Sequence, residues 1–461
     1  MIRLFNVYYP VRTLVLLGGE AVLTCVSFLL ALVIQWQGDL HRVGVVLQIE
    51  DGFLKIFSVS VLALISLYYF DLYDLQRLRS RGETFFRLLV VLGVLSFLLA
   101  ALSFLYPSLL LGKDVFLIGL SILTLALLVW RTLYGWLLLQ PALRERVYVL
   151  GAGPRARAVV EALRSRPELG MEVTGWAGAM GNGSLTREGL TEHLASLTRE
   201  HRVERVIVAL SDRRGTMPVQ QLLDLRMSGI AVEDATNLME KITGKISVEE
   251  LNPSWLLFSE GFHLSAGFLF ARRLLSKLVS LAVLLLVLPL IPLIILAIRI
   301  TSPGPVLYRQ KRVGRNGLIF DCFKFRTMRQ DAEADTGPTW ASDDDPRITP
   351  VGNFLRKTRL DEIPQFWNVL CGDMGFVGPR PERPEFVEML TREIPYYQLR
   401  HIIRPGITGW AQVCFPYGAS VEEAREKLQY DLYYIKNMSL AFDLYIIFRT
   451  IKTVLFGRGA K

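Results

Sequence analysis

Cysteine is scarce in this sequence, and its few cysteines are far apart. The four are Cys25, Cys322, Cys371 and Cys414, and no two of them form a CxxC pair. Structural zinc sites and disulfide frameworks both need cysteines at short, regular spacings. The sequence therefore argues against both kinds of scaffold, and we expect four buried thiols in a reducing compartment.

The features of a nucleic-acid-binding protein are also missing. The net charge is +9, yet the chain has no basic helix with interleaved aromatic residues and no zinc-finger spacing. We therefore expect no nucleic-acid partner. The positive charge instead fits a protein that lies beside anionic lipid or handles phosphates.

Charged residues are few, at 21% of the chain against 51% hydrophobic residues, which indicates a membrane protein. Four long apolar runs occupy residues 14–36, 53–70, 88–106 and 115–139. Each is close to the roughly 20 residues that a spanning helix needs. The first run is no signal peptide, because it lacks a small-residue cleavage site and three more runs follow. We predict a four-helix transmembrane bundle over residues 1–140.

Arginines mark one side of this bundle. They precede the first run, separate the second from the third and follow the fourth, at Arg3, Arg12, Arg77, Arg79, Arg81, Arg87, Arg144 and Arg146. The other two loops, residues 37–52 and 107–114, are poor in lysine and arginine. The positive-inside rule therefore places both ends of the bundle in the cytoplasm.

Two charged residues lie inside the apolar runs. Glu20 and Arg131 are each about 12 Å from the cytoplasmic end of their run, at 1.5 Å per residue. Charges at such depth usually find partners, so we predict that these two residues pair. The alternative is that each reaches the membrane surface or faces the bundle separately.

Residues 141–260 have the alternating pattern of a small α/β domain. An apolar run, residues 146–150, enters a glycine turn, and a helical stretch follows over residues 154–165. Further strand candidates are residues 173–178, 205–210 and 229–234. This alternation predicts a parallel sheet and a Rossmann-like middle domain of the CoA- or NAD-binding type.

The glycine turn approximates a dinucleotide-binding fingerprint. Its glycines are Gly151 and Gly153, but Pro154 removes a backbone donor. The second strand, which ends near Trp176, offers no acidic residue for a ribose hydroxyl. We therefore expect a Rossmann-like scaffold without a bound dinucleotide and without redox chemistry.

A fifth apolar run, residues 278–298, opens the last domain, residues 261–461. It follows a linker over residues 251–270, carries Pro289 and Pro292 at its centre and has basic residues on both flanks. A straight fifth span is the default for this length, but it would carry one basic flank and the whole last domain across the membrane. We therefore predict a re-entrant helix over residues 272–300 that returns to the cytoplasmic side, with the prolines supplying the break.

The last domain concentrates cations and tight turns in a pattern that suits phosphates. In a strand, Lys324 and Arg326 point to one face, and two cations on a common face suit a diphosphate. The alternative is an edge strand with a solvated face. Arg380 lies between two prolines, which suits a preorganised contact but equally a rigid surface turn.

Asp361 and Glu362 form a carboxylate pair among cations. Pro364 favours the first turn of a helix, so Asp361 is equally well explained as a helix N-cap. Adjacent carboxylates can also divide the work of catalysis, one attacking phosphorus while the other holds a divalent ion. The residues themselves leave both interpretations open.

The stretches SPGPVLYRQKRVG, KFRTM, LDEIPQFWNVLCGDMGFVGPRPE and RPGITGWAQV occur in this order from residue 302 onward. From about Arg272 to the C-terminus, the chain resembles the bacterial sugar transferase family, the monotopic phosphoglycosyl transferases. Its layout is similar to that of the large initiating transferases of exopolysaccharide synthesis, in particular those of exosortase systems. One departure is Leu288, where many members have serine before the proline that breaks the membrane helix.

The resemblance implies a C-terminal α/β catalytic domain and a two-step reaction. Asp361 attacks the sugar-linked phosphorus of a UDP-sugar, UMP leaves, and a polyprenyl phosphate takes the sugar phosphate from the aspartate. Glu362 is implied to bind Mg²⁺, and Lys324, Arg326, Arg380 and Arg404 to contact phosphate or nucleotide. The implied location is the bacterial inner membrane, with the soluble domains cytoplasmic; whether the chain forms a homodimer is left open.

Three rival classes fit less well. A nucleotide-sugar dehydratase needs a Tyr-xxx-Lys pair, and the sequence has none. A non-catalytic assembly protein has no need of the Asp–Glu pair or its cations. A polytopic lipid transferase needs many more spans.

Overall fold

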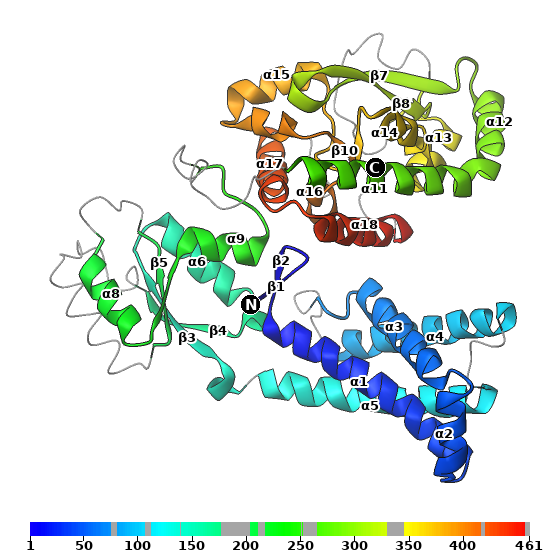
Figure 1. Cartoon of the computed structure of the whole chain (residues 1–461). Coiled ribbons are helices and arrows are strands. Elements are labelled where there is room, and N and C mark those ends of the chain that lie inside the picture. The colour runs from blue at the N-terminus through cyan, green and yellow to red at the C-terminus, as the bar shows by residue number, and fades with distance from the viewer. Residues whose placement is uncertain are drawn as a thin grey trace. The chain divides into compact units, whose positions relative to one another are not determined.

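The computed structural model describes residues 1–74, 81–106, 112–138, 140–176, 203–210, 217–249, 251, 265–329, 345–415 and 420–456. Internal contacts divide the chain into two units, which are drawn in Figure 1. Unit 1 contains residues 1–2 and 9–235, and unit 2 contains residues 3–8 and 236–461. The arginines at positions 77 and 79, and most of the linker predicted over residues 251–270, lie outside the described residues.

The apolar helices of unit 1 correspond to the four predicted spans. They are α1 (Val11–Gln35), α3 (Gly52–Tyr69), α4 (Arg81–Leu105) and α5 (Lys113–Leu138). All four are long and apolar enough to cross a membrane. Large apolar side chains such as Phe53, Phe97 and Leu125 are exposed on their surfaces, as expected for helices that lipid surrounds.

Small residues bring α1 and α5 close together. A Cβ atom on Gly19 of α1 would lie 2.3 Å from the Trp130 ring of α5, and one on Gly119 of α5 would lie 2.8 Å from Phe28 of α1. Small residues at contact points allow membrane helices to approach closely. Helix α2 (Leu40–Gln48) was not predicted; Asp39 caps it by accepting hydrogen bonds from two backbone N–H groups.

The middle of the chain folds around a parallel sheet. Its strands β3 (Glu145–Leu150), β4 (Met171–Trp176), β5 (Arg205–Val208) and β6 (Ala231–Asp234) take the order β4-β3-β5-β6, with every neighbouring pair parallel. The predicted strands are thus present. Helices α6 (Pro154–Arg164) and α8 (Val219–Met227) and the 3-10 turns Pro141–Leu143 and Pro167–Leu169 accompany the sheet.

Gly151 follows β3 with φ +153°, a backbone conformation that favours glycine. A Cβ atom there would lie 2.5 Å from the Ala209 carbonyl oxygen. Glycine at position 151 therefore allows the ends of β3 and β5 to lie close together, and this structural role requires no ligand.

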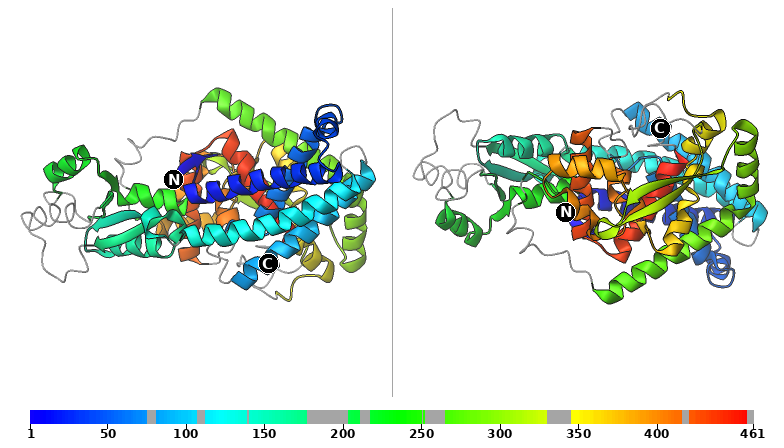
Figure 2. Two further views of the ribbon diagram at one scale, coloured as in Figure 1. Left: turned by 90° about the horizontal axis from the view of Figure 1, so that it is seen from below. Right: turned by 90° about the horizontal axis from the view of Figure 1, so that it is seen from above.

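A broken apolar helix opens the last domain. Helix α11 (Ala266–Val287) ends in a 3-10 turn (Leu288–Leu290), and α12 (Ile291–Thr301) follows. The prolines therefore interrupt the run as predicted, and Figure 2 shows that α12 leaves the axis of α11. The start of α11 at Ala266 means that the predicted linker ends earlier than residue 270.

An antiparallel hairpin follows, formed by β7 (Leu307–Val313) and β8 (Ile319–Phe325) around the turn Arg315–Gly317. Short strands β9 (Gly375–Val377) and β10 (Gly406–Thr408) pair in parallel. The other elements of unit 2 are α9 (Ala235–Thr243), α13 (Pro350–Lys357), η7 (Leu360–Glu362), α14 (Gln365–Cys371), α15 (Pro384–Glu393), η8 (Tyr397–Ile402), α16 (Trp410–Cys414), α17 (Val421–Lys436) and α18 (Leu440–Leu455).

The N-terminal hairpin, β1 (Ile2–Leu4) and β2 (Val7–Tyr9), belongs mainly to unit 2. Arg3 donates to Asn437 Oδ1 at 2.7 Å, and Asn6 Nδ2 donates to the Asn437 carbonyl at 2.7 Å. The Tyr433 hydroxyl donates to the Asn6 carbonyl at 2.9 Å. The first residues of the chain are thus bound to some of the last, a contact that the sequence did not predict.

Candidate active site

The Asp361–Glu362 pair lies on a 3-10 turn between two helices. Arg359, just before the turn, adopts φ +59°, an uncommon conformation for a residue other than glycine, and redirects the chain after α13. The N-cap position of α14 is occupied by Pro364, and Asp361 makes no capping hydrogen bond. The N-cap interpretation of Asp361 is therefore wrong. Both carboxylates are buried.

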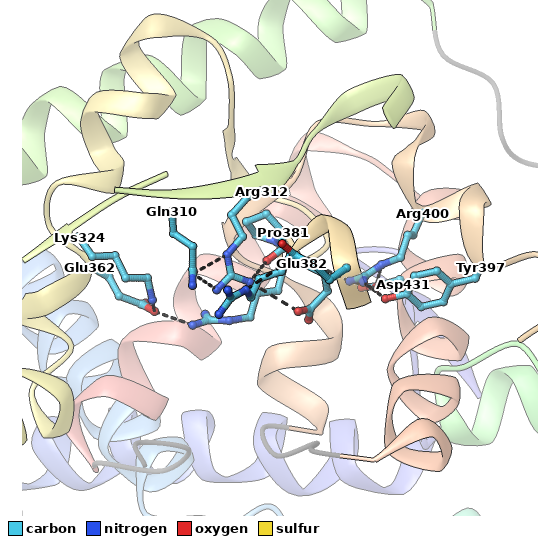
Figure 3. A network of polar contacts seen from close by, with 12 residues as sticks. Gln310, Arg312, Lys324, Glu362, Pro381, Glu382, Tyr397, Arg400 and Asp431 are labelled. Atoms are coloured by element: carbon cyan, nitrogen blue, oxygen red, sulfur yellow. Dashed lines mark hydrogen bonds and ion pairs between the residues drawn. The ribbon is translucent and has the colours of Figure 1, made fainter. Parts of the chain in front are cut away.

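Three cations surround one oxygen of Glu362. Arg380 Nη2 lies 2.7 Å from Oε1, Lys324 Nζ lies 3.2 Å from it, and Arg359 Nη1 lies 3.8 Å from it. Figure 3 shows Lys324 and Glu362 at one end of this polar network. Burial alone would raise the pKa of Glu362, but Arg380, Lys324 and Arg359 together hold the pKa well below its usual range. Glu362 is therefore an ionised carboxylate.

Asp361 is in a different electrostatic situation. Within the described part of the chain it makes no hydrogen bond or ion pair, and burial raises its pKa above the ordinary value for aspartate. The Glu362 charge raises the pKa further, while Lys324 and Arg356 lower it. The two adjacent carboxylates thus differ: one is held by cations, and the other is free to react.

The position of Lys324 depends on Asn368 of α14. The Asn368 Oδ1 atom accepts from the Phe323 backbone N–H at 3.1 Å, and its Nδ2 atom donates to the Asp321 carbonyl at 2.8 Å. These bonds join β8 to α14, the helix that follows the dyad. Lys324 is thereby fixed relative to Glu362.

The loop that carries Arg380 is held from two sides. On one side, Arg312 donates to the Pro381 carbonyl at 2.8 Å, and the Val313 N–H donates to the Glu382 carbonyl at 2.9 Å. On the other side, Arg400 donates to the Arg380 carbonyl at 3.0 Å. The backbone from Arg380 to Glu382 is thus fixed. Figure 3 shows Arg312 beside Pro381, with Arg400 farther along the same network.

Arg400 is itself anchored by buried groups. Its guanidinium lies 2.9 Å from Asp431 and donates to the Tyr397 hydroxyl at 2.6 Å. Burial raises the pKa of Asp431 to about 6, although Arg400 acts in the opposite direction. A series of polar contacts therefore links Asp431 to Arg400, Arg400 to the Arg380 carbonyl, and the Arg380 side chain to the Glu362 carboxylate.

Arg326 has a different place from the one that strand alternation predicted. Strand β8 ends at Phe325, and Arg326 turns to the end of α12, where it donates to the Ser302 carbonyl at 2.6 Å and to the Pro303 carbonyl at 2.8 Å. The two cations thus have different partners, because Arg326 is bonded to backbone carbonyls and Lys324 contacts Glu362. Arg404 is also separate from the dyad and lines a hollow beside α11. The structure brings together Asp361, Glu362, Lys324 and Arg380.

Comparison with known proteins assigns this site to a family. The bacterial sugar transferase family model matches residues 268–457, and a CoA-binding domain model matches residues 68–230. The chain is 34% identical over 326 residues to the UDP-glucose:undecaprenyl-phosphate glucose-1-phosphate transferase of Escherichia coli (strain K12), covering 69% of each protein.

The chain belongs to the bacterial sugar transferase family.

One further relative is named for a different sugar, and another for exopolysaccharide production. The UDP-N-acetylgalactosamine-undecaprenyl-phosphate N-acetylgalactosaminephosphotransferase of Aeromonas hydrophila is 43% identical over 236 residues. That alignment covers 51% of this chain and 55% of the relative, so the chain spans about half of that protein's length. The exopolysaccharide production protein PSS of Rhizobium leguminosarum bv. phaseoli is 41% identical over 186 residues, which are 93% of its length and 39% of this chain.

Sequence analysis missed several residues that position this sugar transferase site. Asn368 lies inside the motif at residues 360–382, but its uncharged side chain gave no indication of a role. Arg400 and Asp431 lie outside the quoted motifs and are 31 residues apart. A lone aspartate on the buried face of α17 was the one available signal, because buried carboxylates usually need a cationic partner.

Proposed function

We propose that the chain transfers a sugar 1-phosphate from a UDP-sugar to undecaprenyl phosphate, releasing UMP. The observation that carries this proposal is the difference between the two carboxylates. Glu362 is held by three cations, whereas Asp361 has no partner within the described residues. A free carboxylate beside a cluster of cations is suited to attack an anionic phosphorus centre.

In the first step, a carboxylate oxygen of Asp361 attacks the phosphorus that carries the sugar. The bond from that phosphorus to the UMP oxygen breaks, and UMP leaves with the electron pair. In the second step, a phosphate oxygen of the polyprenyl phosphate attacks the same phosphorus, and the Asp361 carboxylate leaves. The aspartate thus returns to its starting state after each cycle.

The cations around Glu362 have a binding role in this reaction. Lys324 and Arg380 lie within hydrogen-bonding distance of Glu362 and beside Asp361, where the diphosphate has to lie for attack. Arg380 is rigidly placed because its loop is bonded to Arg312 and Arg400. Such preorganised donors stabilise negative charge as it develops on the phosphoryl oxygens.

The dyad also fits a magnesium ion. The ion pairs with all three cations are made by Oε1 of Glu362, and among the described residues neither its Oε2 nor the Asp361 carboxylate accepts a hydrogen bond. Mg²⁺ commonly takes one or two protein carboxylates together with substrate phosphates. We propose that Glu362 is its main ligand; when bound, the ion would neutralise charge on the diphosphate.

The location follows from the charge pattern and the broken helix. We propose an inner-membrane protein whose bundle ends, middle domain and last domain all face the cytoplasm. In this arrangement α11 and α12 enter the membrane and return, so the dyad meets cytosolic UDP-sugar and the membrane-embedded acceptor at the same surface. The middle domain serves as a Rossmann-like scaffold.

The named relatives act on different sugars, so the proposal covers UDP-sugars as a class, in the first membrane step of exopolysaccharide synthesis. To test it, the purified full chain is incubated with a panel of UDP-sugars and Mg²⁺, first without and then with undecaprenyl phosphate. We expect one UMP per chain without the acceptor and continuous turnover with it. Release of UDP instead of UMP, or no release with any sugar, would contradict the proposal.

A further inference from the structure

A second group of cations lies along the first turns of α11. Arg273 and Lys277, one helical turn apart, line a hollow together with Arg404, which precedes β10, and Arg315 of the β7–β8 turn. The hollow encloses about 520 Å³, its open mouth included, and Met374 and Ile403 contribute to its wall. It shares none of its cations with the Glu362 cluster.

Acids that would compensate these cations are scarce: the charge of Asp373 raises the pKa of Arg404, but Asp373 forms no ion pair with it in the described part of the chain. Within the described part of the chain, Arg273, Lys277 and Arg404 make no ion pair, and Arg315 donates its Nε only to the Ile402 carbonyl, at 3.2 Å. Burial lowers the pKa of Arg404, and the charges of Arg273 and Arg315 lower it further. Arg272, which lines the same hollow, differs because Asp443 lies 2.9 Å from it. The hollow is therefore short of negative charge.

The hollow lies along α11 at the point where the charged part of the helix gives way to its apolar run. Lys277 is the last charged residue before the charge-free, mainly apolar run of residues 278–298. Leu274 and Leu278, its neighbours on the helix, are exposed. A cation at the start of an apolar membrane segment lies at the level of lipid head groups. The hollow thus opens where lipid phosphates are concentrated.

We propose that this hollow is a second anion site, which binds the phosphate group of a membrane lipid. Arginine and lysine together provide the donors that a phosphate needs, and a partly enclosed site strengthens each contact relative to open water. Helix α14, seven residues or about 10 Å long, begins just after the dyad, and its Val369 lines this hollow, which uses none of the cations around Glu362. The site is therefore separate from the reacting phosphorus, and the inference does not depend on the proposed transfer reaction.

The test measures how fast Lys277 reacts with an amine-acetylating reagent. The full chain, in neutral detergent without sugar nucleotide, is treated with the reagent alone or with one of three probes: a short-chain polyprenyl phosphate, a short-chain phosphatidic acid or inorganic phosphate. Peptide mass spectrometry follows Lys277, with the exposed Lys311 as internal control. We expect saturating lipid phosphate to slow the acetylation of Lys277 by about tenfold and to leave Lys311 unchanged.

Variants identify the cause of this protection. Arg273→Gln and Arg404→Gln should each abolish it, while Arg299→Gln, which removes an exposed cation at the end of α12, should retain it. Unchanged acetylation of Lys277 with every probe would overturn the site, as would protection that persists in the Arg273→Gln/Arg404→Gln double variant. Protection by inorganic phosphate alone would overturn the lipid assignment, whereas protection by either lipid probe supports it and identifies the preferred head group.

Discussion

Arg131 Nη2 lies 2.7 Å from Glu20 Oε1, so an ion pair joins α5 to α1 inside the apolar bundle. The Tyr73 hydroxyl donates to the other Glu20 oxygen at 2.5 Å, and Arg131 donates to the Leu72 carbonyl at 3.0 Å. The pairing predicted from burial depth is therefore confirmed. Each group supplies the partner that a charge at this depth requires.

The pair leads to a prediction about stability. We expect Glu20→Gln and Arg131→Gln each to lower the thermal unfolding midpoint of the full chain in detergent, because each leaves one buried charge alone. The double variant should be less unstable than the sum of the two, with a coupling energy of about 0.5–3 kcal/mol. The exposed Asp39–Arg42 pair is the control and should show little coupling. Additive effects at Glu20 and Arg131 would contradict the prediction.

The second prediction concerns the nucleophile. Asp361→Asn should reduce UMP release by at least about 10³-fold, because the amide cannot attack phosphorus. Labelled sugar phosphate should be trapped on the wild-type protein and not on this variant. Glu362→Gln should be impaired through metal binding and partly recover with added Mg²⁺. Turnover of Asp361→Asn near the wild-type rate would exclude the proposed mechanism.

The third prediction uses the pH dependence of the first step. Burial raises the pKa of Asp361, and attack requires the ionised form, so the rate should fall as pH decreases through this raised value. The acid limb of single-turnover UMP release should therefore lie above about pH 4, the ordinary range for aspartate. Glu362→Gln removes a charge that raises this pKa and should move the limb to lower pH. A limb at or below pH 4 in the wild type would argue against Asp361 as the group observed.

The fourth prediction assigns a positioning role to Arg400. Arg400→Gln removes the bond to the Arg380 carbonyl, and we expect kcat/KM for UMP release to fall by about 10- to 100-fold, with the larger part in KM for the UDP-sugar. Asp431→Asn should act similarly, and the double variant should be little worse than the worse single one. Arg392→Gln, on the exposed face of α15, is the control. A loss of folded protein with unchanged KM would indicate a structural role alone.

The fifth prediction tests the return of the broken helix. In a chain whose four native cysteines are replaced by alanine, Leu275→Cys and Pro303→Cys should both resist an impermeant thiol reagent applied from the periplasm. Lys113→Cys, at the first residue of α5 on the side opposite to the cytoplasmic ends, should react. Labelling of position 303 from that side would rule out the re-entrant topology.

The helices and strands were largely predictable because their signals are local. The first apolar run, residues 14–36, became Val11–Gln35, since length and hydropathy decide where a membrane helix lies. The strand predicted at residues 205–210 is observed at Arg205–Val208, because a short run of apolar, β-branched residues is also a local signal. The short helix α2 was missed because its apolar content is modest and because aspartate, the residue type that caps it at position 39, is also common in loops.

The site was predictable where one motif holds both partners. Asp361 and Glu362 were noticed because they are adjacent, Lys324 because it alternates with Arg326, and Arg380 because two prolines flank it. The roles of all four came from the family resemblance. The partners of Arg326 were not predicted, because its bonds to the Ser302 and Pro303 carbonyls are tertiary contacts that strand alternation does not reveal. Arg400 and Asp431 meet through tertiary packing, and sequence spacing carries no information about such contacts.

The hairpin at the very start of the chain has a consequence for the order of folding. Residues 3 and 6 bond to Asn437, more than 430 positions later, so one partner is synthesised long before the other. Contacts of such separation form late, because most of the chain must be in place before they close. The last domain therefore reaches its complete set of contacts only after the membrane helices have been synthesised, which ties its maturation to the rest of the chain.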